Sequence, residues 1–148
     1  MPWENSLLHW YSFRGAGQLG VIFSKTAGGT NGEYWIDQDV LGINSMRGVI
    51  VNTSLSRVNC DKSLSFNTND GKWHFYAMTY NGSAINDYAD GVFVGSCFQS
   101  GNIQSTAIPL NINAYDSNLE PAATIDDARI YNRALSAAEI QALYNAEK

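Results

Sequence analysis

The sequence predicts an all-β protein: an antiparallel β-sandwich of the jelly-roll type with one short C-terminal helix. Short apolar or alternating runs are separated by clusters of Gly, Asn, Asp and Ser, which is typical of strands joined by tight turns. About nine such runs precede a single helical pattern, and this order does not fit alternating βα units. The 148 residues, 45% hydrophobic and 16% charged, indicate one compact domain spanning residues 1–148.

The predicted strands follow one another along the whole chain. They span residues 6–13, 19–25, 33–39, 47–53, 63–67, 73–80, 92–98, 108–115 and 124–132. The segments between them, such as TAGGTNG, NTNDG and ADG, contain residues that tolerate positive φ. Two packed antiparallel sheets therefore account for the pattern.

The final element is a helix with a clear start. Ser136 and Glu139 have the spacing of a capping box, and Leu135 and Ile140 have the spacing of a hydrophobic staple. An isolated helix of about ten residues is marginal in water, so this helix must dock on the sandwich. The residues expected on its docking face are Ile140, Leu143 and Tyr144.

The strand at residues 73–80 has two apolar faces. Alternation places Trp73, Phe75, Ala77 and Thr79 on one face and His74, Tyr76, Met78 and Tyr80 on the other. One face must line the core between the sheets. The face with polar-tipped aromatic residues either forms a half-wet groove or is covered by loops or by the helix.

Composition excludes several classes of function. A net charge of −5 argues against a nucleic-acid backbone or an anionic membrane as the main partner. No apolar run is long enough to span a membrane, and the N-terminus does not resemble a secretory signal. The chain is therefore either cytoplasmic or a piece of a longer exported protein. Cys60 and Cys97 either form one disulfide or are separate thiols.

The C-terminal half resembles a known family. The stretches DGKWHFYAMTYNGS and YADGVFVGS, followed by IDDARIYNRALSAAEIQALY, resemble bacterial laminin-G-like domains of the concanavalin A-like lectin/glucanase superfamily. The likeness extends over most of residues 6–146. The residues that match are Trp73, Tyr80, Gly82, Tyr88, Asp90, Gly91, Ile125, Asp126, Ile130, Tyr131, Asn132, Leu135, Ser136, Glu139 and Ile140.

The chain departs from this family in two places. Family domains usually carry another strand before the one at 6–13, so we expect this chain to lack the usual first strand. Because the first strand of a jelly roll commonly lies beside the last, the edge of the strand at 124–132 is expected to be open. We therefore expect a homo-oligomer formed through that edge. Residues 83–89 also differ from the family pattern, and we expect a remodelled loop there.

The sequence does not predict an enzyme. Glucanase members of the superfamily use E-x-D-x-x-E on one strand, whereas this chain has only Glu33, Asp37 and Asp39 with a different spacing. These three carboxylates are expected to form an exposed acidic edge. His9 and His74 are the only histidines, and no nucleophile elbow accompanies them.

The resemblance implies a structural calcium ion, because related jelly rolls hold one with the aspartate after the isoleucine of the final strand. Here that residue is Asp126, and Asp116 is the second candidate ligand. The alternative is that Asp126 or Asp127 pairs with Arg129 or Arg133, or accepts backbone N–H groups.

Two functions are open at this point. The first is a lectin-like module that binds a glycan without turnover, since sugar rings pack on aromatic faces and their hydroxyls need polar partners. The second is a protein-interaction or oligomerising module. An open aromatic row would favour sugar, and a filled face with a flat apolar edge would favour protein. Trp35 and Trp73 are expected in the core. The candidate carbohydrate-binding residues are Tyr34, His74, Tyr76, Tyr80, Asn81, Asn86, Asp87 and Tyr88.

Overall fold

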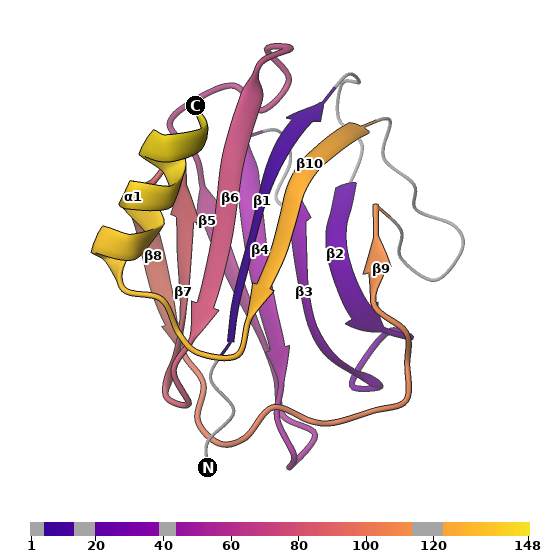
Figure 1. The fold of residues 1–148 in the computed structure, drawn as a ribbon. Helices are drawn as coiled ribbons and strands as arrows, with labels where there is room; N and C mark the ends of the chain where they lie inside the picture. The colour runs from indigo at the N-terminus through magenta and orange to yellow at the C-terminus, as the bar shows by residue number, and fades with distance from the viewer. Residues whose placement is uncertain (1–4, 14–19, 39–43, 114–122) are drawn as a thin grey trace.

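The structure is a computed structural model that describes residues 5–13, 20–38, 44–113 and 123–148, arranged as two five-stranded antiparallel sheets and one helix (Figure 1). In order across the first sheet lie β10 (Ala123–Tyr131), β1 (Asn5–Phe13), β6 (Trp73–Tyr80), β7 (Ala84–Ala89) and β8 (Val92–Phe98). In order across the second lie β5 (Arg57–Ser63), β4 (Ser45–Val51), β3 (Gly32–Gln38), β2 (Gly20–Thr26) and β9 (Asn111–Ile112). The predicted fold class is confirmed.

The observed strands differ from the predicted ones mainly between residues 57 and 115. The predictions for 73–80 and 92–98 match β6 and β8. The predicted strand at 63–67 is wrong, because β5 ends at Ser63. The predicted loop at 83–89 is also wrong: β7 lies between β6 and β8, and the polar Asp87 on its inward face hides the alternation.

The core lies between the two sheets. Side chains from β2, β3 and β4 meet those from β6 and β7, and Tyr76, Met78 and Tyr80 belong to this cluster. The inward face of β6 is therefore the one that carries His74. Cys60 on β5 and Cys97 on β8 form a disulfide that joins the two sheets along one side of the sandwich.

Helix α1 (Ala137–Glu147) covers the outward face of the first sheet (Figure 1). Its capping box is present, since Ser136 Oγ accepts the Glu139 amide and the Glu139 carboxylate accepts the Ser136 amide. Leu135 and Ile140 are buried against Phe75, Ala77 and Tyr88, which provides the docking that a short helix needs.

The turn between β7 and β8 also supports the helix. Asp90 and Gly91 both have positive φ, as a two-residue hairpin turn of the primed type requires. A Cβ atom on Gly91 would lie 2.8 Å from Cδ1 of Tyr144 on α1, so the helix rests directly on this turn. The glycine is needed here for both its φ angle and its small size.

The first sheet has two ends. Strand β10 pairs with β1 and, within the described residues, no strand pairs with its other edge. Strand β8 occupies the opposite end of the sheet.

In the part of the chain that the structure describes, no helix is both long and apolar enough to cross a membrane.

A candidate ligand-binding cleft

The predicted aromatic groove is wrong. Tyr76 and Tyr80 are completely buried, and Tyr34 and Tyr88 are only 8% and 6% exposed. Tyr34, Tyr76 and Tyr80 fill the space between the sheets, and Tyr88 lies beneath α1. The inward face of β6 is therefore filled, because the second sheet covers it and a sandwich core must be closely packed.

The polar residues predicted to line that groove have structural roles. Asn81 Oδ1 accepts the amides of Ser83 and Ala84 and shapes the turn before β7. Asn86 donates from Nδ2 to Thr79 Oγ1 over 3.4 Å. Asp87 is completely buried, and this burial raises its pKa to about 8 against the opposing effect of the Gly48 amide.

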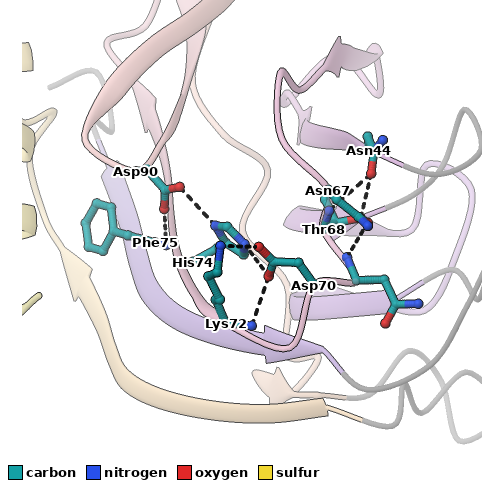
Figure 2. Close-up of polar contacts among 9 residues, drawn as sticks. Asn44, Asn67, Thr68, Asp70, Lys72, His74, Phe75 and Asp90 are labelled. Carbon is teal, nitrogen blue, oxygen red and sulfur yellow. Dashed lines mark hydrogen bonds and ion pairs between the residues drawn. The ribbon is translucent and has the colours of Figure 1, made fainter.

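His74 is buried and joins two loops (Figure 2). Its Nδ1 lies 2.9 Å from Asp90 Oδ2 and its Nε2 lies 3.2 Å from Asp70 Oδ1, while its ring stacks on Phe66 at 4.2 Å. Burial opposes a charge on the ring, but Asp90 and Asp70 outweigh it and raise the pKa of His74. Both ring nitrogens are used, so His74 is not available to a ligand.

Further hydrogen bonds hold the same loops (Figure 2). Asn44 Oδ1 accepts the amide of Thr68, and Asp70 Oδ1 accepts the amide of Lys72. Asp90 Oδ1 accepts the amide of Phe75 and so ties the hairpin turn to β6. This network fixes the connection between the two sheets.

The carboxylates of β3 are buried, so the prediction of an exposed acidic edge is wrong. Glu33 Oε1 accepts bonds from Lys25 Nζ and from the amide of Thr106. Asp37 Oδ2 accepts the indole N–H of Trp35 at 2.9 Å, and burial raises the Asp37 pKa to about 7. Asp39 lies outside the described residues. Glu33 and Asp37 thus hold neighbouring side chains and do not face open solvent.

An open cleft lies instead on the outward face of the first sheet, beside the C-terminal end of α1. Its volume is about 330 Å³. Trp73, which was expected in the core, is 46% exposed here. The residues lining the cleft are Trp73, Asp126, Asp127, Tyr144, Glu147 and Lys148.

Strand register brings these side chains together. Phe75 and Asp126 both pair with Trp10 of β1, so they lie on the same face of the sheet, the face that α1 covers. Opposite this point β10 has a bulge, and Asp127 takes a positive φ of 49°. The bulge lets the adjacent aspartates Asp126 and Asp127 both reach the cleft.

Hydrogen bonds and ion pairs organise the charges of the cleft. Asp126 Oδ1 accepts the amide of Asp127 at 2.8 Å. Arg129 Nη2 lies 3.3 Å from Asp127 Oδ1, and Arg129 Nη1 lies 2.5 Å from Glu147 Oε1. The Lys148 ammonium lies over the Tyr144 ring, 5.3 Å from its centroid. Arg129 therefore joins β10 to the end of the helix.

The predicted alternatives for the two aspartates are both present, since Asp127 pairs with Arg129 and Asp126 accepts a backbone N–H. Calcium at Asp126 stays a prediction, because Asp116 lies outside the described residues. Among the residues that the structure describes, no group of three or more His, Cys, Asp or Glu side chains is placed to hold a metal ion.

Sequence reasoning did not predict five residues of the cleft as site residues: Trp73, Asp127, Tyr144, Glu147 and Lys148. Trp73 is the first residue of β6, directly after the turn at residues 70–72, and a strand end is often less covered than its middle. That position is the one signal in the sequence that favours exposure. The contributions of the helix depend on how α1 docks, which the sequence pattern does not specify.

Solved structures with the same fold include binding domains of clostridial toxins. The binding domain of Paraclostridial Mosquitocidal Protein 1 has a TM-score of 0.74 at 16% identity, covering 97% of this chain and 37% of that one. The receptor binding domain of botulinum neurotoxin D has a TM-score of 0.75 at 13% identity, covering 99% and 38%. The chain thus spans little more than a third of the length of these structures.

Comparison with curated protein sequences found no match. The family described as the concanavalin A-like lectin/glucanases superfamily matches residues 4–141. This match covers nearly the whole sandwich and the first part of α1. The chain therefore belongs to the concanavalin A-like lectin/glucanases superfamily.

Proposed function

We propose that this chain is a non-catalytic carbohydrate-binding module and that the cleft beside Trp73 holds a sugar ring. The observation that carries the proposal is the exposure of Trp73, which is 46% exposed and lines a cleft of about 330 Å³. A large aromatic side chain left open in a concave site is costly in water, which favours a ligand with an apolar face.

The chemistry of the cleft fits a sugar. The C–H face of a sugar ring packs on an indole, and its hydroxyls donate to carboxylates. Trp73 and Tyr144 supply aromatic surface, and Asp126 and Asp127 supply acceptor oxygens beside it. Trp73 lies on strand β6 and Tyr144 on helix α1, so regular secondary structure positions both aromatic residues before the ligand arrives.

Two further points support binding without turnover. The similar solved structures are described as a binding domain and a receptor binding domain, which favours a binding role for this fold. Glu33 and Asp37, the described carboxylates nearest to the glucanase pattern in the sequence, are each less than 10% exposed and are engaged by neighbours. Neither is open to a glycosidic bond.

The test is titration of soluble oligosaccharides, followed by calorimetry and by tryptophan fluorescence. We expect Trp73→Ala to weaken binding by about tenfold, the range of one lost aromatic stacking contact. Phe98→Ala is the matched control, because Phe98 is a 77% exposed aromatic residue on β8, away from the cleft. Equal affinity of the protein and the Trp73 variant, or an equal loss in the control, would contradict the proposal.

A second candidate function is protein interaction through the ends of the first sheet. A filled sheet face is the feature expected of a protein-interaction module, and the inward face of β6 is filled. On β8, Val92, Phe93 and Phe98 are 62%, 52% and 77% exposed, and on β10 Ile130 is 42% exposed. Exposed apolar side chains on an edge strand favour pairing with another chain.

Sedimentation equilibrium tests this second function. A concentration-dependent dimer that Ile130→Asp on β10 or Phe98→Asp on β8 abolishes, and Trp73→Ala does not, would support it. A monomer at every concentration would contradict the homo-oligomer expected from the sequence.

A further inference from the structure

The cleft beside Trp73 already holds an ammonium group that belongs to the chain. Lys148 Nζ lies 5.3 Å from the centroid of the Tyr144 ring, within the range of a cation–π contact. Both residues line the cleft together with Trp73, which presents a second and more strongly cation-attracting ring. A cationic group is thus compatible with the space and the aromatic surface of this site.

The charges of the cleft also favour a cation. Three carboxylates, those of Asp126, Asp127 and Glu147, face the cations of Arg129 and Lys148, which leaves an excess of one negative charge. Arg129 contacts both Asp127 and Glu147. Asp126 accepts only the amide of Asp127 and, within the described residues, has no ion-pair partner. Its carboxylate is the group that a cationic ligand would meet.

We infer that the ligand of this cleft carries a protonated amine, and that its class is the amino sugars. This inference rests on the proposed function, since it specifies which sugar the cleft takes. The ammonium lies against the Trp73 and Tyr144 rings and pairs with Asp126, while the ring carbons pack on the indole. Lys148 occupies part of the same site and competes with the ligand amine.

The experiment compares β-linked oligomers of equal length made of glucosamine, N-acetylglucosamine and glucose. Titrations are run at about pH 5.5, below the pKa of an aliphatic amine and above that of an ordinary carboxyl. We expect the glucosamine oligomer to bind about tenfold more tightly than the other two, which corresponds to about 1.4 kcal/mol. This preference should shrink as salt is added, because the cleft is open to solvent.

Two variants assign the preference to named groups. Asp126→Asn keeps one oxygen that can accept the Asp127 amide, and it replaces the charged carboxylate by a neutral amide. The preference for glucosamine should therefore fall to near unity. Lys148→Gln removes the competing ammonium and should raise the affinity for the glucosamine oligomer. Phe98→Ala should change neither quantity.

The outcomes separate the inference from the function on which it rests. If the glucose oligomer binds as tightly as the glucosamine oligomer, and Trp73→Ala weakens both, the proposed function stands and the inference is overturned. If none of the three oligomers binds, both fail. A preference that survives Asp126→Asn, or that appears only with added calcium, would also overturn the inference, because Asp126 would then have another role.

Discussion

Loss of the disulfide between Cys60 and Cys97 is expected to destabilise this protein strongly. The bond joins β5 of one sheet to β8 of the other, and both strands lie at the ends of their sheets. A strand at the end of a sheet has hydrogen-bonded neighbours on one side only, so a covalent link there restrains two elements that are otherwise weakly held.

The magnitude follows from the length of chain that the bond closes. The two cysteines are separated by 37 residues. In the chain-entropy treatment a loop of this size removes about 13 cal/mol/K from the unfolded state, or about 4 kcal/mol at room temperature. Since measured values often fall below this limit, the expected loss is about 2 to 4 kcal/mol.

Urea unfolding of the oxidised protein, the reduced protein and the Cys60→Ala, Cys97→Ala double variant measures this loss. The reduced protein should also show a larger dependence on urea, because its unfolded chain is less compact. Reducing agent should leave the double variant unchanged, which controls for side effects of the reductant. A loss below about 1 kcal/mol in both forms would refute the entropic reasoning.

Three further outcomes are expected. The pKa of His74 is raised in the fold, so protonation of His74 stabilises the folded protein. This contribution is complete below the ordinary histidine pKa of about 6.5 and is lost as the pH rises through the raised value. Urea unfolding should therefore show that the stability difference between the protein and His74→Gln shrinks across this pH range. Asp87 has a pKa of about 8 in the fold and stays protonated below it, whereas the same carboxyl in the unfolded chain ionises from about pH 4. The stability of the folded protein therefore falls as the pH rises from about 4 to about 8. Asp87→Asn, neutral throughout, should therefore raise Tm at neutral pH, and a lower Tm would contradict the buried-charge reasoning. Ser136→Ala should cost about 1 kcal/mol by thermal unfolding and Ser136→Asp should not, since Asp also caps a helix.

Much of the fold follows from local patterns in the sequence. The alternation at 73–80, the Asp90–Gly91 turn and the capping box at Ser136 each determine one element and depend little on the rest of the chain. Strand β7 was missed because Asp87 points inward, where alternation predicts an apolar residue. A buried carboxyl is tolerated there because the surrounding core keeps it protonated.

The candidate site could not be predicted in this way. Alternation sorted the side chains of β6 into two faces, but both faces are apolar, so the pattern did not identify the one that lies inward. That choice depends on the second sheet, which covers Tyr76 and Tyr80, and on α1, which covers Phe75 and Ala77.

The sequence by itself determined that this chain forms an antiparallel sandwich closed by a capped helix, because turn residues, period-two alternation and caps act over a few neighbouring residues. Only the tertiary structure decided which aromatic residues are buried and that Trp73 is open beside Asp126. The physical reason is that burial depends on what packs against a side chain, and here the covering groups come from segments far apart in the sequence.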